Sequence, residues 1–124
     1  MKAILTVLGE ISPGTLGFCH SHEHLSIDKG QSCKVNPALC IDDPIRTAAE
    51  LALFKQAGGT AVVDAQPIGC GRNASVLQQL ARQTGVHIIA STGFHKMQFY
   101  TQDHWIHHAT EELLAGWFIR ELTE

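Results

Sequence analysis

Short apolar runs alternate with amphipathic segments along the chain, and this alternation limits the folds that are open to it. Residues 60–64 and 86–91 are rich in Val, Ile and Ala, which is typical of buried strands. Residues 74–84 place apolar side chains at helical spacing, with Asn73 as a cap before them and Gly85 as a stop after them. Because strands that alternate with helices form a parallel sheet with helices outside it, the pattern predicts an α/β fold.

Two more helices and a hairpin complete the predicted order of elements. Asp43 is a favourable N-cap with Pro44 directly after it, and the helix that they begin ends at the glycines of residues 58–59. Thr110 caps a last helix that starts at Glu111 and reaches about residue 123. The other predicted segments are a hairpin of residues 3–8 with 15–18, a strand of residues 18–25, and irregular loops at residues 26–42 and 92–104.

Two histidines flank Glu23 in the predicted strand of residues 18–25. Side chains alternate along a strand, so His22 and His24 point to the same face, whereas a helix would separate them by about 200°. Two neutral imidazoles that converge in this way can hold one divalent transition metal. The alternative is a pair of polar histidines on an edge strand. His20 has the same parity and is expected on the same face.

Further polar residues follow the other predicted strands. Asp64 ends one strand, just before a glycine-rich loop at residues 67–72, and the run of residues 91–95 follows the next strand and ends at His95. In parallel sheets, functional residues gather at the carboxyl ends of the strands. We therefore expect the histidine pair, Asp64 and His95 to lie on one rim of the sheet.

Composition and charge argue against several classes of protein. The 124 residues carry a formal net charge of −3 and contain no Lys/Arg run, which argues against a nucleic-acid or anionic membrane surface. The apolar runs are far shorter than the roughly 20 residues that span a bilayer, and residues 1–8 are too short for a signal peptide. We therefore expect one cytoplasmic domain. Its cysteines form no Cys-x-x-Cys pair and are expected to be reduced thiols, namely Cys19, Cys33, Cys40 and Cys70.

The residues around the histidine pair resemble the N-terminal signature of the phosphotriesterase family, in the amidohydrolase superfamily. The resemblance is carried by the run Thr15-Leu-Gly-Phe-Cys-His-Ser-His-Glu-His-Leu25. The other segments that match in order and spacing are residues 59–64 leading to Gly71-Arg72-Asn73, residues 84–93 and residues 117–124. The resemblance implies an eight-stranded β/α (TIM) barrel, of which residues 1–124 are the N-terminal part, with an N-terminal β-hairpin and the first three βα units.

The resemblance also implies a site and its chemistry. It assigns His22 and His24 to one ion of a binuclear centre, usually zinc, which cleaves ester, lactone or phosphoester bonds of a small molecule with a metal-activated hydroxide. Glu23 is no ligand in the family. Asp64 either hydrogen-bonds a ligand histidine from behind the metal or satisfies loop amides. His95 stands where the family lines its substrate pocket, and several lactonase-type members carry tyrosine there. The remaining ligands come from the fourth, fifth, sixth and eighth strands, beyond residue 124.

Two other functions stay open on the sequence alone. One is an inactive truncated fragment, whose unpaired sheet edge would favour self-association. The other is a small non-enzymatic α/β module that binds a metal or an anion, with the loop Gly69-Cys-Gly-Arg72 as the anion site. This loop lacks both the Gly-x-x-x-x-Gly-Lys-Ser/Thr pattern and the dinucleotide-binding fingerprint, which argues against the module.

Overall fold

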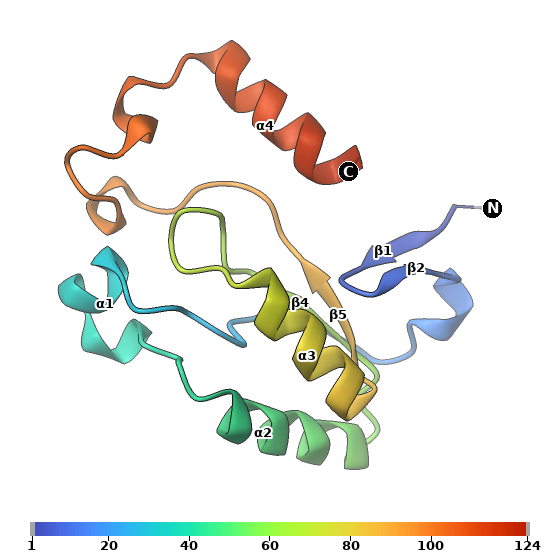
Figure 1. Cartoon of the computed structure of the whole chain (residues 1–124). Coiled ribbons are helices and arrows are strands. Elements are labelled where there is room, and N and C mark those ends of the chain that lie inside the picture. Colours follow the sequence, from blue (N-terminus) through green and yellow to red (C-terminus); the bar gives the residue numbers. More distant parts are fainter. Residues whose placement is uncertain (1, 124) are drawn as a thin grey trace.

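A three-stranded parallel sheet in the order β3-β4-β5 forms the centre of the protein, in a computed structural model that describes residues 2–123. The strands are β3 Cys19–Glu23, β4 Ala61–Asp64 and β5 His87–Ala90. A long helix comes after each strand in the chain, and these helices are α2 Pro44–Gln56, α3 Ala74–Thr84 and α4 Glu111–Thr123. In Figure 1, α2 and α3 lie side by side along the sheet, while α4 lies apart from them. The predicted α/β fold with a parallel sheet is confirmed.

The predicted helix caps explain where the long helices begin and end. Asp43 accepts hydrogen bonds from the Ile45 and Arg46 amides at the start of α2, and Asn73 caps α3 through the Val76 amide. Gly85 ends α3 with φ of +66°, a left-handed conformation that favours glycine. Asp43 and Asn73 satisfy amides that have no partner inside the helix, and the Gly85 amide donates to the Ala81 carbonyl, so these three residues fix helix ends.

The main core lies between the sheet and the helices α2 and α3. Leu51 of α2 and Leu77 and Leu80 of α3 pack with Val62 of β4 and Ile88 of β5, and all five are buried. Burial of each Leu, Ile or Val side chain stabilises a fold by about 1.5–3 kcal/mol. This cluster therefore holds both helices on the sheet and fixes the positions of the strand ends.

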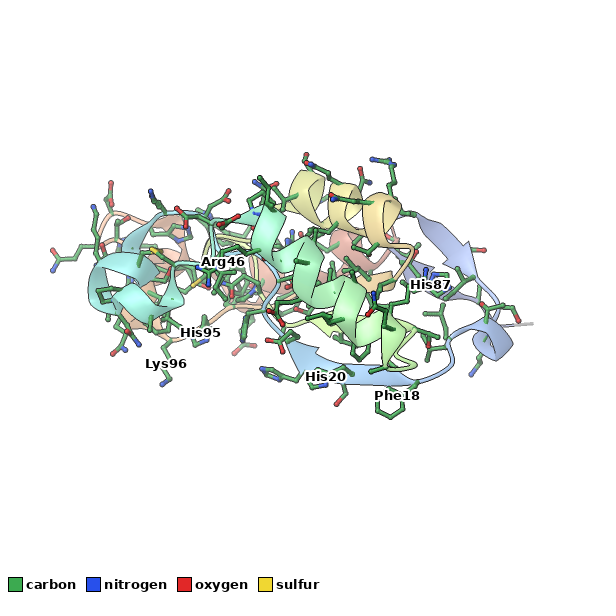
Figure 2. The ribbon with its side chains drawn as sticks, turned by 90° about the horizontal axis from the view of Figure 1, so that it is seen from below. Phe18, His20, Arg46, His87, His95 and Lys96 are labelled. Carbon is green, nitrogen blue, oxygen red and sulfur yellow. A yellow bond between two sulfur atoms is a disulfide. The ribbon has the colours of Figure 1, made fainter. Side chains whose placement is uncertain are left out.

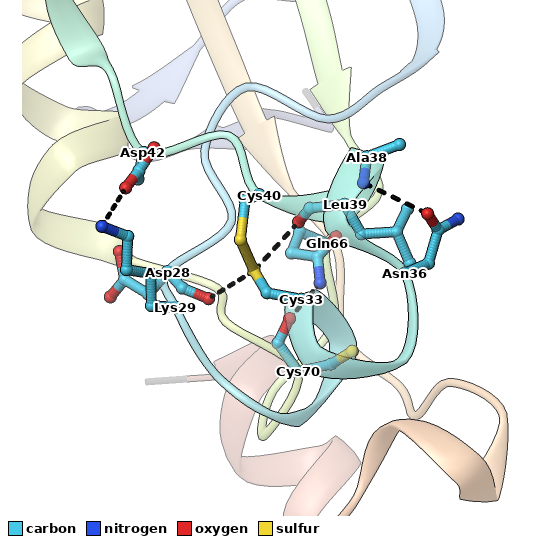
Figure 3. The surroundings of a disulfide bond; sticks show 10 residues. All are labelled: Asp28, Lys29, Cys33, Asn36, Ala38, Leu39, Cys40, Asp42, Gln66 and Cys70. Atoms are coloured by element: carbon cyan, nitrogen blue, oxygen red, sulfur yellow. Dashed lines mark hydrogen bonds and ion pairs between the residues drawn. A yellow bond between two sulfur atoms is a disulfide. The ribbon is translucent and has the colours of Figure 1, made fainter.

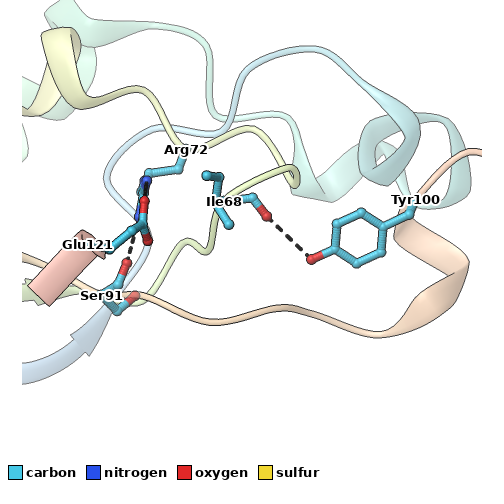
Figure 4. Close-up of polar contacts among 5 residues, drawn as sticks. All are labelled: Ile68, Arg72, Ser91, Tyr100 and Glu121. Atoms are coloured by element: carbon cyan, nitrogen blue, oxygen red, sulfur yellow. Dashed lines mark hydrogen bonds and ion pairs between the residues drawn. The ribbon is translucent and has the colours of Figure 1, made fainter. Parts of the chain in front are cut away.

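A charged contact connects α4 to the ends of β4 and β5. The Arg72 guanidinium, which lies in the loop after β4, donates to Glu121 Oε2 and to the Ser91 carbonyl, each at 2.9 Å (Figure 4). Tyr100 Oη lies near the Ile68 carbonyl in the same region. The hydrogen bond from Arg72 holds the pKa of Glu121 below its ordinary value. Helix α4 is thus held by a partly buried ion pair, although no apolar side chain of the helix is fully buried.

The N-terminal hairpin differs from the predicted one. Strand β1 Ile4–Thr6 pairs antiparallel with β2 Gly9–Ile11, so the expectation that residues 15–18 form the second strand is wrong. The Thr6 hydroxyl donates to the Gly9 carbonyl at 2.7 Å and accepts from the Leu8 amide, which closes the tight turn. Residues after this turn enter the 3-10 helix η1 Pro13–Thr15, with Ser12 as its cap.

The segment between β3 and α2 is more ordered than the predicted loop. It contains α1 Gln31–Val35 and the 3-10 helix η2 Pro37–Leu39. These turns bring the Cα atoms of Cys33 and Cys40 to 5.2 Å, and the two residues form a disulfide (Figure 3). The expectation of four reduced thiols is wrong for this pair, because two short helical turns without a readable apolar period fold the segment back on itself. Cys19 and Cys70 are free.

The loop after β5 also contains short helical turns, η3 Met97–Phe99 and η4 Trp105–His108. Phe94 contacts Trp105 and Phe118 in this region, with ring centroids 5.5 and 5.7 Å away. These aromatic contacts pack the loop against α4. Among residues 2–123, no helix combines the length and the apolar character that crossing a bilayer requires.

Candidate functional site

The rings of His22 and His24 are neighbours at the carboxyl end of β3. Their centroids are 5.3 Å apart and the ring planes are nearly perpendicular. His22 lies in the strand and His24 directly follows it, so the extended backbone keeps both side chains on one side, as the alternation predicts. His22 is exposed and His24 is half-buried.

His95 joins this pair across the rim of the sheet. The three histidines line one cavity of about 400 Å³, whose walls also include Phe94 and Lys96. Figure 2 shows His95 and Lys96 beyond the end of β3, on the side away from Phe18. Because β3, β4 and β5 run parallel, the loops that follow them meet at the same edge, and the structure brings His22, His24 and His95 together there.

His20 does not share this cavity, contrary to the expectation from its parity. The pairing of β3 with β4 is irregular between His20 and Glu23, so the alternation is broken inside the strand. His20 Nε2 lies 3.8 Å from Glu23 Oε2, and both residues line a neighbouring cavity of about 510 Å³ next to α2, whose walls also include His24. Glu23 also accepts a hydrogen bond from the His24 amide at 2.9 Å.

The protonation form of the His24 ring follows from its contact with Gln66. The Gln66 Nε2 group donates to the Cys70 carbonyl, and Gln66 Oε1 lies 2.8 Å from His24 Nδ1. An amide oxygen can only accept, so Nδ1 of His24 carries the proton. Of the two neutral tautomers, this contact favours the one whose lone pair is on Nε2, and that lone pair can bind a metal.

Gln66 is a site residue that the sequence reasoning missed. Its side chain is buried, with 2% exposure, and it lies in the loop after β4 beside the disulfide (Figure 3). Glutamine is not a usual zinc ligand and is neither an acid nor a base, so no catalytic or zinc-binding motif includes it. The available signal was its position two residues after Asp64, at the carboxyl end of a buried strand.

Asp64 lies behind the histidines and does not line their cavity. It is fully buried, and its Oδ1 accepts a hydrogen bond from the Leu25 amide at 2.8 Å. Its Oδ2 has no hydrogen-bond partner among the described residues. Burial raises the pKa of Asp64 above its usual value, and the hydrogen bond from the Leu25 amide opposes this shift. The contact with Leu25 matches the predicted alternative in which the carboxylate satisfies loop amides.

We expect Asp64→Ala to lower the free energy of unfolding by about 1–3 kcal/mol, because the buried Leu25 amide loses its acceptor. Asp64→Asn keeps an oxygen for this amide and is the matched control, with an expected change below about 1 kcal/mol. Urea denaturation of both variants measures the difference. An alanine variant as stable as the parent chain would show that the contact does not hold the end of β3.

The His95 side chain is fixed by its surroundings. Its Nδ1 accepts a hydrogen bond from the Lys96 amide at 2.7 Å, and its ring centroid lies 4.6 Å from that of Phe99. The His95 amide donates to Tyr100 Oη at 2.7 Å. Burial, together with the nearby Lys96 and His24, lowers the pKa of His95, which favours the neutral ring.

The described residues supply two converging imidazoles and no larger metal cluster. Among residues 2–123, no group of three or more His, Cys, Asp or Glu side chains is arranged to hold a metal ion. His104 caps η4 through the Ile106 amide, and His107 Nε2 contacts the Thr101 carbonyl. The donor set at His22 and His24 suits a borderline-soft divalent ion such as zinc, and it fills half of a tetrahedral shell.

Comparison with known proteins agrees with the arrangement of these elements. The sequence model of the phosphotriesterase family matches residues 2–124. An N-acetyltaurine hydrolase of Danio rerio is 31% identical over 121 residues, which cover 74% of this chain and 35% of that protein. The chain spans 35% to 41% of the length of such curated relatives.

Two solved structures of related proteins superpose on this chain. An amidohydrolase from Mycoplasma synoviae superposes with a TM-score of 0.90 at 27% identity, over 99% of this chain and 36% of that one. The lactonase Lmo2620 from Listeria monocytogenes superposes with a TM-score of 0.72 at 31% identity, over 79% of this chain and 30% of that one.

Proposed function

We propose, since this chain belongs to the phosphotriesterase family, that it is part of a metal-dependent hydrolase and supplies two ligands of its metal centre, His22 and His24. The observation that carries the proposal is the neighbouring pair of rings, with His24 held by Gln66 in the form that leaves Nε2 free. A bound divalent ion such as zinc would act as a Lewis acid on an ester, lactone, amide or phosphoester group and would activate water for attack.

The residues of this chain have distinct roles in the proposed site. Gln66 orients His24, and Asp64 fixes the backbone at the end of β3 through the Leu25 amide. His95 faces the same cavity and contacts the substrate. Among residues 2–123 no group of three or more His, Cys, Asp or Glu side chains could hold a metal, so the proposed centre needs further ligands besides His22 and His24.

We further propose that residues 1–124 correspond to the first three βα units of a β/α barrel. Its support is the superposition on the Mycoplasma synoviae amidohydrolase, of which this chain covers 36%. Several apolar side chains of the helices are exposed, including Ile45 of α2 and Ile119 and Leu122 of α4. Exposed apolar surface of this kind favours association, so we expect the isolated chain to self-associate.

The isolated 124-residue chain is expected to hydrolyse neither a paraoxon-type phosphotriester nor an acyl lactone at a useful rate, even with zinc. A catalytic zinc needs about three protein ligands, and the described residues offer two. The assay compares the chain with its His22→Ala/His24→Ala double variant. Turnover well above that of the double variant would mean that the chain recruits further ligands from another copy of itself.

A chimera tests the proposed role directly. In it, this chain replaces the matching segment of the Listeria monocytogenes lactonase, which corresponds to 30% of that protein. We expect zinc-dependent lactone hydrolysis that the His22→Ala/His24→Ala change abolishes. His108→Ala is the matched control, because its exposed side chain lies outside the cavity. A chimera whose activity survives the double change would contradict the proposal.

A further inference from the structure

One wall of the cavity at the histidine pair consists of polar residues that are not proposed metal ligands. His95 and Lys96 form this wall, and they line a space of about 400 Å³ together with His22 and His24. Of the described side chains that line the cavity, Lys96 is the one cationic residue, and no carboxylate is among them. The wall therefore offers a positive charge with no acidic side chain to neutralise it.

The hydrogen-bonding form of His95 follows from its neighbour in the chain. The Lys96 amide donates to His95 Nδ1 at 2.7 Å, so Nδ1 bears the lone pair and the neutral ring carries its proton on Nε2. This is the opposite form to that of His24, which carries its proton on Nδ1. Among the described residues, no group accepts a hydrogen bond from His95 Nε2.

The ring is also held in place before any ligand arrives. Phe99 packs against it with ring centroids 4.6 Å apart, and Tyr100 Oη accepts from the His95 amide. A donor that is fixed in advance loses little conformational entropy when an acceptor binds. His95 thus presents an N–H group at a defined position of the wall.

We propose that the substrate of this site carries an oxyanion, such as a carboxylate, sulfonate or phosphonate, which accepts a hydrogen bond from His95 Nε2 and pairs with Lys96. The proposal rests on the proposed function, because it places the reacting bond at His22 and His24. A charge-assisted hydrogen bond is stronger than one to a neutral carbonyl, so the wall discriminates between an anionic compound and its neutral isostere.

The first part of the test needs no metal. Long-range ¹H–¹⁵N NMR of the histidine-labelled 124-residue chain without zinc should show His95 protonated at Nε2 and bare at Nδ1, and His24 with the opposite pattern. A proton on His95 Nδ1 would overturn the inference, whatever the metal does. Absence of zinc binding at His22 and His24 would overturn the proposed function and leave this result intact.

The second part measures the preference for an anion. N-acetylglycine and its neutral isostere N-acetylglycinamide are titrated into the chain, with and without zinc, and the His95 signals report binding. We expect N-acetylglycine to bind about fivefold more tightly than N-acetylglycinamide. In the Lys96→Gln variant, this ratio of dissociation constants should fall to about twofold. Lys34→Gln is the matched control, because Lys34 lies at a different cavity beside the disulfide.

Two variants of His95 separate the hydrogen bond from the space that the ring fills. His95→Gln keeps an N–H group near the position of Nε2 and should retain most of the preference, whereas His95→Phe should lose it. Equal binding of the acid and the amide to the parent chain would overturn the proposal. A preference that survives both His95→Phe and Lys96→Gln would overturn it as well.

Discussion

The His24→Ala variant is expected to bind zinc at least about 100-fold more weakly than the parent chain. Loss of a hydrogen-bond partner behind a ligand already lowers metal affinity by about 10–100-fold, and loss of one of two ligands must exceed this. His22 alone then remains, and a single exposed imidazole has little affinity for zinc. Isothermal titration calorimetry with zinc measures the change.

Two histidine variants serve as controls for this loss. His20→Ala removes an imidazole of the same strand that does not line the cavity of His22 and His95, and His108→Ala removes an exposed one from η4. Both should keep the affinity of the parent chain. An equal loss in either variant would mean that zinc binds through histidines other than the proposed pair.

Gln66→Leu is expected to lower the zinc affinity by about 10–100-fold, although residue 66 does not touch the metal. Leucine has nearly the same size but cannot accept a hydrogen bond from His24 Nδ1. The His24 ring is then free to rotate and to change its tautomer. The measurement is a zinc titration together with circular dichroism, which shows whether the variant still folds. An unchanged affinity in a folded Gln66→Leu chain would contradict the role that we assign to Gln66.

Gln66→Glu is the matched variant for this prediction. The glutamate still presents an oxygen to His24 Nδ1, so it should keep the zinc affinity, while it loses the donor to the Cys70 carbonyl. The two contacts of Gln66 are separated in this way. If Gln66→Glu binds zinc as weakly as Gln66→Leu, the contact with Cys70 rather than the contact with His24 supports the site.

Local rules predicted most of the central fold. Asp43, Asn73 and Gly85 mark helix ends because their side chains or backbone freedom satisfy the free groups there, and these effects act within a few residues. The hairpin partner and the Cys33–Cys40 disulfide were missed for the opposite reason. Both depend on short turns that bring separate residues together and leave no apolar period in the sequence.

The candidate site was predicted in part for similar reasons. His22 lies near the end of β3, and His24 and His95 follow the ends of β3 and β5, so topology alone places these residues on one edge. His20 does not line the cavity of these three histidines, because an irregularity in β3 breaks the alternation of side chains. The amino-acid composition does not predict such an irregularity. Gln66 acts through the acceptor that it presents to His24 across 42 positions of sequence, and such a contact appears only once the fold is known.

Histidine-selective ¹⁵N NMR during a zinc titration tests the central claim most directly. We expect zinc to shift the signals of His22 and His24 together, with Nε2 as the affected nitrogen of His24 because Nδ1 donates to Gln66. The signals of His20, His104, His107 and His108 should remain in place. Shifts at these histidines, with His22 and His24 unchanged, would contradict a metal site at the end of β3.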